Sequence, residues 1–179
     1  MRSRIALVLS VMLLSAVAAR AQQGGELPAE AKQRLDSLVG KWTSKWEYLN
    51  KEGEVVGSAT GGEVGRYAQG DWLVEWTTEV IDQSGQKRIS KAWWFYNRQD
   101  KKIYLTSVGQ DGDLWVLSGD PVEFTITSWP KQRADGSTII IRFKHGEAEE
   151  GILTAVMEFS LDEGKTWTRG FRQTMTPAG

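Results

Sequence analysis

The spacing of hydrophobic residues changes once along the chain, from a helical period to a strand period. Leu35, Leu38 and Val39 form one apolar stripe at helical spacing. Proline is tolerated in the first turn of a helix, and glycine commonly follows the last turn. Pro28 and Gly40 therefore predict the two ends of one short helix.

After that helix, apolar and polar residues alternate with a period of two. A strand that is dry on one face and wet on the other produces this pattern. Turn signals such as Asp135-Gly136 and Asp162 to Gly164 separate the runs at short spacing. The residues expected on the dry faces include Trp42, Trp46, Val74, Trp76, Ala92, Trp94, Tyr96, Ile141, Phe143, Ala155, Met157, Phe159, Trp167, Phe171 and Met175.

These runs amount to about nine or ten strands joined as successive hairpins, because no connection is long enough for a crossover helix. Successive antiparallel strands of this number usually close on themselves and lose their edges. We therefore predict an all-β fold, an antiparallel up-and-down barrel of about ten strands with a short N-terminal helix that plugs or flanks one end. A two-sheet sandwich is the structural alternative.

The first 21 residues have the layout of a secretory signal peptide. Arg2 and Arg4 precede an apolar stretch from Ile5 to Ala18, and Ala19-Arg20-Ala21 is a small-x-small cleavage site. The apolar stretch is shorter than the roughly 20 residues that span a bilayer. We predict cleavage after Ala21 and export to the periplasm or the medium, with a flexible lead-in over 22–27 and the barrel domain over 28–179.

Charge and composition exclude several kinds of site. Removal of Arg2, Arg4 and Arg20 from the 22 basic residues leaves 19, against 23 acidic residues, so the mature chain is mildly acidic and a nucleic-acid partner is not expected. The absence of cysteine excludes disulfides and thiolate sites, and a single histidine excludes a multi-histidine metal site within one chain. We expect no cofactor and no membrane span in the mature chain, and the sequence leaves the oligomeric state open.

Three short motifs have both a chemical and a structural interpretation. Ser160 to Trp167 fits the S-x-D-x-G-x-T-W pattern that recurs in sialidase propellers, but a propeller needs several repeats and the chain has one. The Gly57–Gly65 run lacks the ending of a phosphate loop, so we interpret it as a bent barrel strand. His145 could bind haem iron or act as a base, and we interpret it instead as a solvated loop residue.

The aromatic content is the least ordinary feature, with nine Trp, four Tyr and five Phe. Inward-facing aromatic side chains either fill a core or line a pocket in the barrel mouth. Arg169 alternates in phase with Trp167 and Phe171 and is expected inside, where it would meet an internal carboxylate or an acidic ligand group. The candidate ligand-binding residues are Trp46, Trp76, Trp94, Tyr96, Phe143, Met157 and Arg169.

The order of these motifs resembles a known bacterial family. The segments that carry the resemblance are the helix that ends in Leu38-Val39-Gly40-Lys41-Trp42, the strand with Gly61-Gly62, Gly70-Asp71-Trp72-Leu73, and the Ser160 to Trp167 hairpin. They resemble the bacterial domain-of-unknown-function family 1579, which implies a lipocalin-like, calycin-type barrel and no established activity. Gly40-Lys41-Trp42 is also similar to the start of the haem-binding nitrobindins, but Trp167 to Gly179 contains no histidine where that group has its haem ligand.

Three functions follow as hypotheses. The first is an exported protein that binds a small hydrophobic ligand without transforming it. The second is a barrel enzyme that acts on a bound substrate through internal carboxylates or Arg169. The third is an interaction protein with a filled barrel that works through its surface. A cavity separates the first two from the third, and convergent acids with raised pKa values in that cavity would favour the enzyme.

Overall fold

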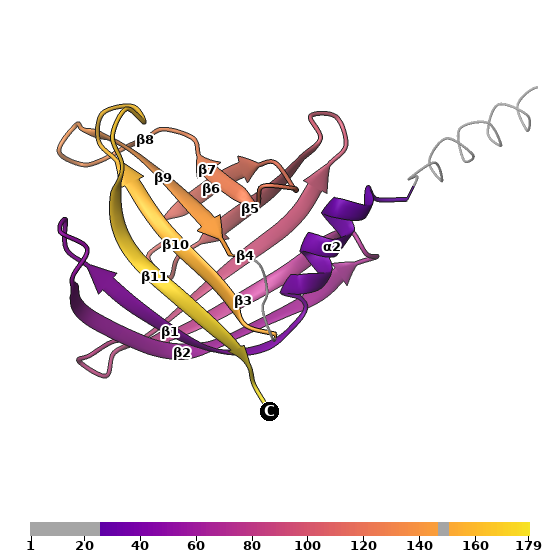
Figure 1. The fold of residues 1–179 in the computed structure, drawn as a ribbon, viewed down its shortest axis with the longest axis horizontal. Coiled ribbons are helices and arrows are strands. Elements are labelled where there is room, and N and C mark those ends of the chain that lie inside the picture. The colour runs from indigo at the N-terminus through magenta and orange to yellow at the C-terminus, as the bar shows by residue number, and fades with distance from the viewer. Residues whose placement is uncertain (1–25, 147–150) are drawn as a thin grey trace, which may run out of the picture.

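The computed structural model describes residues 26–146 and 151–179, so the predicted signal peptide and most of the lead-in lie outside the described residues. Within these residues, one helix precedes eleven strands, and Figure 1 labels them. The elements are α2 (Ala29–Leu38), β1 (Gly40–Leu49), β2 (Val55–Gln69), β3 (Leu73–Ile81), β4 (Lys87–Asn97), β5 (Lys102–Val108), β6 (Leu114–Gly119), β7 (Thr125–Ser128), β8 (Lys131–Gln132), β9 (Thr138–His145), β10 (Leu153–Ser160) and β11 (Thr168–Pro177).

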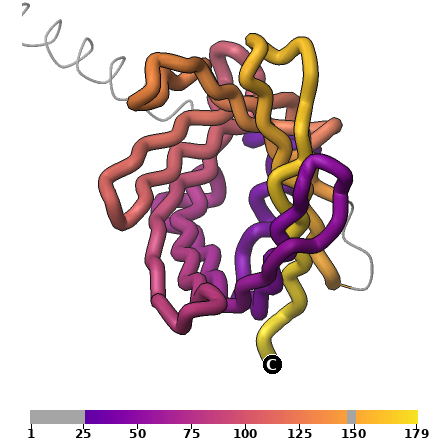
Figure 2. The backbone as a smooth tube through the Cα atoms, turned by 90° about the vertical axis from the view of Figure 1, so that its left-hand side faces the viewer, coloured from indigo at the N-terminus to yellow at the C-terminus, as the bar shows by residue number. Residues whose placement is uncertain are grey.

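Ten of the described strands form a closed antiparallel barrel. From β1 to β7 each strand pairs with the next, β7 pairs with β9, and the series continues through β10 and β11. The pairing of β11 with β1 closes the ring, and Figure 2 shows the strands surrounding one axis. The two-residue β8 pairs only with β9. The predicted barrel of about ten hairpin-connected strands is confirmed, and the sandwich is not observed.

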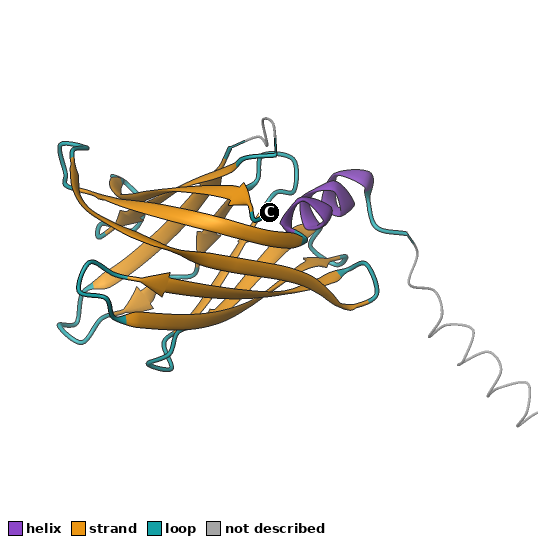
Figure 3. Cartoon of the chain, turned by 90° about the horizontal axis from the view of Figure 1, so that it is seen from below, coloured by secondary structure: helices purple, strands orange, loops and turns teal. Residues whose placement is uncertain are grey.

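Helix α2 lies at one end of the barrel (Figure 3). Leu35 and Leu38 of its apolar stripe are buried together with Ala31, in the same core as Val74 and Ile103 from the strands. This position confirms the predicted place of the helix. Val39, the third residue of the predicted stripe, follows the helix and is 37% exposed. Leu27, which the sequence places in the lead-in, is only 5% exposed and packs in this core, so the packed domain begins before Pro28.

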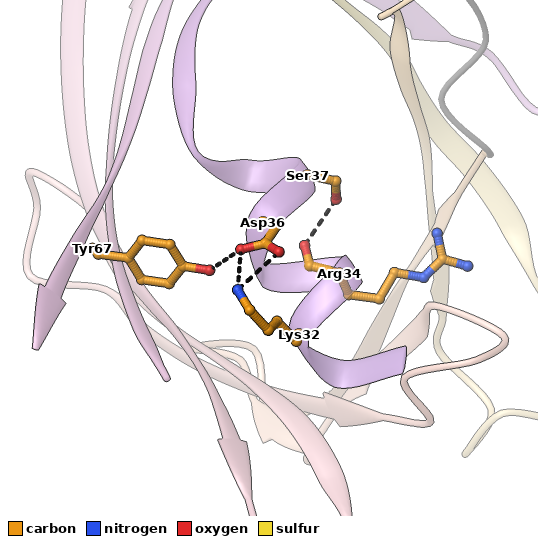
Figure 4. A network of polar contacts seen from close by, with 5 residues as sticks. All are labelled: Lys32, Arg34, Asp36, Ser37 and Tyr67. Atoms are coloured by element: carbon orange, nitrogen blue, oxygen red, sulfur yellow. Dashed lines mark hydrogen bonds and ion pairs between the residues drawn. The ribbon is translucent and has the colours of Figure 1, made fainter. Parts of the chain in front are cut away.

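Polar contacts fasten the exposed side of α2 to the barrel. Arg34 donates from Nε to the Pro121 carbonyl at 3.0 Å and from Nη2 to the Val122 carbonyl at 2.9 Å. Asp36 accepts hydrogen bonds from Lys32 at 3.0 Å and from the Tyr67 hydroxyl (Figure 4). The Tyr67 hydrogen bond and the neighbouring Lys32 hold the pKa of Asp36 below its usual value. The helix is therefore tied to two separate parts of the barrel rim.

The glycine-rich run forms the long strand β2 rather than a phosphate loop, as predicted. Gly65 shows why small residues are needed there. A Cβ at this position would lie 2.1 Å from the Leu38 carbonyl oxygen and 2.8 Å from the Trp76 ring. The close approach of the helix end to β2 thus requires glycine.

The Ser160 to Trp167 segment is a stabilised hairpin between β10 and β11, as predicted. Asp162 accepts hydrogen bonds from the Thr166 backbone N–H at 2.9 Å and the Thr166 hydroxyl at 2.6 Å. The Ser160 hydroxyl accepts from the Gly164 N–H at 2.8 Å, and Gly164 has a φ of 86°. The hydrogen bonds to Asp162, led by that of the Thr166 hydroxyl, lower its pKa to about 2.

Truncation of the helix stripe should destabilise the whole domain. We expect Leu35→Ala to lower the free energy of unfolding by about 2–5 kcal/mol, because the side chain is fully buried and leaves a cavity. Urea unfolding followed by tryptophan fluorescence measures this change. Gln33→Ala, on the exposed face of α2, is the matched control and should unfold at nearly the wild-type urea concentration. An equal effect of the two substitutions would show that α2 is not packed on the barrel.

The Asp162 hairpin should give a stabilisation that depends on pH. A carboxylate whose pKa is lowered by folding stabilises the native state above its ordinary value of 3.8 and loses this effect as the pH falls toward about 2. Asp162→Asn should therefore lower the melting temperature at neutral pH, and its difference from wild type should shrink below pH 3.8. The neighbouring Glu163→Gln serves as control. A difference that is the same at every pH would contradict this assignment.

Candidate ligand-binding site

The barrel contains a partly open cavity of about 210 Å³. The helix end forms part of its wall through Leu38, and inward-facing side chains of the strands form the rest. The lining residues are Leu38, Trp46, Glu63, Trp76, Thr78, Ser90, Ala92, Trp94, Leu105, Ser107, Phe143, His145, Phe171, Gln173 and Met175.

Four of the seven candidate residues line this cavity: Trp46, Trp76, Trp94 and Phe143. The three tryptophans are each only 6% exposed. The other three candidates lie elsewhere. Tyr96 is buried in the core shared with the helix. Met157 pairs in register with Phe143 and Phe171, which places it on the inner face, but it is not part of the cavity wall.

The prediction that Arg169 points into the barrel is wrong, because Arg169 is exposed. Strict alternation from Phe171 would place it inside. The register of β10 and β11 shifts instead, so that Met157 pairs with Phe171 and Glu158 pairs with Arg169. This leaves Gly170 as an extra residue in a β-bulge, which reverses the faces of the residues before it. The hypothesis of an internal arginine therefore has no support in the structure.

A carboxylate that the sequence analysis did not single out lies in the cavity wall. Glu63, on β2, is 5% exposed and accepts hydrogen bonds on both oxygens. Oε2 accepts from the Ser44 hydroxyl at 2.6 Å and from Gln173 Nε2 at 2.7 Å. Oε1 accepts from Trp76 Nε1 at 3.1 Å and from the Thr78 hydroxyl at 3.0 Å. Three strands thus direct polar groups at one buried acid.

Two effects act in opposite directions on Glu63. Burial disfavours the charged form and raises the pKa of this carboxyl above its usual value, while the four hydrogen bonds lower it. Burial is the larger effect. None of the ion pairs between described residues includes Glu63.

Trp94 brings an unsatisfied donor to the cavity wall. Its ring packs against Phe124 at 5.9 Å and His145 at 5.6 Å between centroids. Its Nε1 is buried, and it is the one buried side-chain nitrogen or oxygen atom in the described part of the chain without a hydrogen-bond partner. A buried donor without a partner costs free energy, so an acceptor brought within reach of Nε1 would stabilise this arrangement.

The interpretation of His145 as a solvated loop residue is wrong. It is the last residue of β9, lines the cavity, and stacks on Phe124 with ring centroids 4.2 Å apart. Burial lowers its pKa to about 4, so the imidazole is neutral at physiological pH. Nδ1 lies 3.1 Å from the Phe124 carbonyl oxygen, which can only accept, so the proton is on Nδ1 and Nε2 is an acceptor.

A surface hollow adjoins the cavity at the end of the barrel opposite α2, beside the β3–β4 and β5–β6 turns (Figure 3). The hollow has a volume of about 570 Å³ and is lined by residues of β1, β3 and β4 and by the β5–β6 turn. Ser90 borders both the hollow and the inner cavity. Helix α2 lies at the opposite end of the barrel, so the hollow is at the end that the helix does not cover (Figure 3).

Few titratable side chains line the cavity. Among the described residues that line it, Glu63 and His145 are the only titratable side chains. The paired carboxylates of a glycosidase-type mechanism are therefore not present in this wall. What the wall offers is aromatic surface, one buried acid held by four donors, one free indole N–H and one neutral imidazole.

Sequence reasoning could have found Glu63. It shares an alternation phase with Ala59, Gly61 and Gly65, the small residues that face inward on β2. A charged residue in an otherwise small, inward-facing series is a signal of a polar site. Ser44, Thr78 and Gln173 carry no such signal, because short polar residues are common on either face of a strand.

The chain matches no family model and no curated protein. Among solved structures, Rv2717c from M. tuberculosis is similar to it with a TM-score of 0.57 and 11% sequence identity, over 86% of this chain and 100% of that chain. The structure of EF1p2_mFAP2b bound to DFHBI is similar with a TM-score of 0.46 and 8% identity, over 83% of this chain and 99% of that chain. The first likeness shows that the two proteins share a fold.

The fold and the site together define the chain as a closed antiparallel barrel with a helix at one end and an aromatic-walled inner cavity. Within the described residues, no helix is both long and apolar enough to cross a membrane.

The buried carboxyl should make stability fall as the pH rises. The unfolded chain releases the Glu63 proton near 4.5, whereas the folded protein holds it to higher pH. The wild type should therefore lose stability relative to Glu63→Gln as the pH rises from 4.5 through the raised pKa. Gln173 can turn its amide to accept from the amide that this substitution introduces, so the variant should fold. Urea unfolding at a series of pH values gives the comparison, and a constant difference would contradict a raised pKa.

Proposed function

We propose that this protein is an exported barrel that binds one small, largely apolar molecule in its inner cavity without transforming it. The observation that carries the proposal is the cavity wall itself. Five aromatic side chains surround it, namely Trp46, Trp76, Trp94, Phe143 and Phe171, and the buried indole N–H of Trp94 has no partner among the described residues. Apolar walls with a few placed polar groups are the usual composition of a small-molecule site.

The volume limits the size of the ligand. At about 210 Å³, the cavity is smaller than the roughly 300–1,000 Å³ of pockets that hold drug-sized molecules. The ligand we propose is therefore smaller than a typical drug molecule. A longer molecule would have to extend past Ser90 into the surface hollow at the end of the barrel opposite α2.

Two further parts of the proposal rest on the sequence. The signal-peptide layout of residues 1–21 supports export to the periplasm or the medium. The motifs shared with the domain-of-unknown-function family 1579 support membership of that lipocalin-like group, and the barrel fold agrees with this assignment.

A substitution that fills the cavity tests the proposal. Ser107 lines the cavity on β5 beside Ala92, its partner on β4, and none of the hydrogen bonds between described residues involves the Ser107 side chain. We expect Ser107→Phe to occupy the ligand space and abolish binding. Native mass spectrometry of the exported protein, against a denatured control, detects a bound small molecule. Quenching of tryptophan fluorescence by a panel of small apolar molecules detects binding to the stripped protein.

Thr106→Phe is the matched control, because the adjacent residue pairs with Trp93 and faces the outside of the same strand. It should keep the bound mass and the quenching. An apo mass for the wild type, together with no quenching by any member of the panel, would contradict the proposal. Binding that survives Ser107→Phe would place the ligand elsewhere.

A further inference from the structure

The wall around Glu63 directs four hydrogen-bond donors at the two oxygens of its carboxyl group. Trp76 Nε1 and Gln173 Nε2 can only donate, and one acts on each carboxylate oxygen, at 3.1 Å and 2.7 Å. Ser44 and Thr78 complete a set of four neutral donors. An ionised carboxyl accepts from all four groups at once, whereas a protonated one needs the Ser44 or Thr78 hydroxyl, or the Gln173 amide, to turn and accept its hydrogen.

An ionised Glu63 would have no protein counter-ion among the described residues. The donors from β1, β3 and β11 are uncharged, and no Lys or Arg lines the cavity. His145, the other titratable group of the wall, is neutral at physiological pH because burial lowers its pKa. A buried charge without an opposite charge is unfavourable, which is why burial raises the pKa of Glu63. An occupant with a positive charge would offset this cost and favour the ionised carboxylate.

The aromatic walls suit the same kind of occupant. Trp46, Trp76 and Trp94 line the cavity together with two phenylalanines. Aromatic faces attract cations, tryptophan most strongly, and the attraction is larger where water is excluded. An organic cation also satisfies the apolar surface with its carbon groups, which a hydrated metal ion does not.

Two polar atoms of Trp94 and His145 could form hydrogen bonds with a polar group on the ligand. Trp94 Nε1 is a buried donor without a partner, and Nε2 of His145 is an acceptor for which the structure records no partner among the described residues. The two rings lie 5.6 Å apart between centroids. A hydroxyl group on the ligand both accepts and donates a hydrogen bond, so it suits either of these atoms.

We propose that the cavity binds a small organic cation, a quaternary or protonated amine that carries a hydroxyl or another oxygen acceptor. This inference rests on the proposed function, because it names the chemical class of the molecule in the same cavity. Glu63 supplies the compensating charge, the tryptophans supply the apolar and π surface, and Trp94 with His145 selects the oxygen.

The test compares two probes of one shape. Choline carries a trimethylammonium group, and its uncharged carbon isostere carries a tert-butyl group in the same place. We expect choline to bind the purified mature protein about tenfold or more tightly than the isostere, by titration calorimetry. Because the charged form of Glu63 is required, choline affinity should rise as the pH increases through the raised pKa of this carboxyl.

Three variants locate the effect. Glu63→Gln should remove the preference for choline, while Glu75→Gln should keep it, because Glu75 pairs with Lys91 among the exposed side chains of β3 and β4. Ser107→Phe should abolish binding of both probes. Preference for choline that survives Glu63→Gln would overturn the inference.

The outcomes separate this inference from the proposed function. Binding of the isostere and other neutral molecules as tightly as choline, lost in Ser107→Phe, would overturn the cation and leave the cavity as a binding site. No binding of any probe, charged or neutral, would overturn both.

Discussion

The buried carboxylate of Glu63 is the constraint on which the interior of this barrel depends. Its four hydrogen bonds join β2 to β1, β3 and β11. The barrel closes where β1 pairs with β11, so these bonds connect strands on both sides of the closure. Placing an acid there is costly, and the four donors offset only part of the cost because burial still dominates its pKa. The interior is therefore organised around a polar group, and an apolar filling would leave that group without compensation.

The closed sheet and the helix explain why space remains beside this group. Ring closure fixes the inner diameter, and α2 fills only one end, where its apolar stripe joins the core. On β2 the inward positions near the helix are small, and Gly65 leaves room for the Trp76 ring, whose indole N–H then reaches Glu63 at 3.1 Å. Large rings opposite small residues thus leave a cavity in the middle of the barrel.

The fold was predictable because its signals are local. The period change near Gly40 and the hairpin turns specify strands and their order, and closure follows from their number. The site was only partly predictable. Alternation placed the tryptophans and Phe143 correctly, but the Gly170 bulge reversed the face of Arg169, and a bulge depends on the pairing of two strands. Burial of His145 depends on Phe124, which lies 21 positions away in the chain and leaves no pattern near the histidine.

The most direct test of an interior binding site is the indole N–H resonance of Trp94. In a nitrogen-15-labelled sample titrated with choline, we expect this resonance to shift as its N–H gains an acceptor, with nuclear Overhauser contacts to the ligand. The resonance of Trp129, which is 61% exposed, should stay in place. An unchanged Trp94 signal, with shifts confined to exposed tryptophans such as Trp129, would contradict a ligand site inside the barrel.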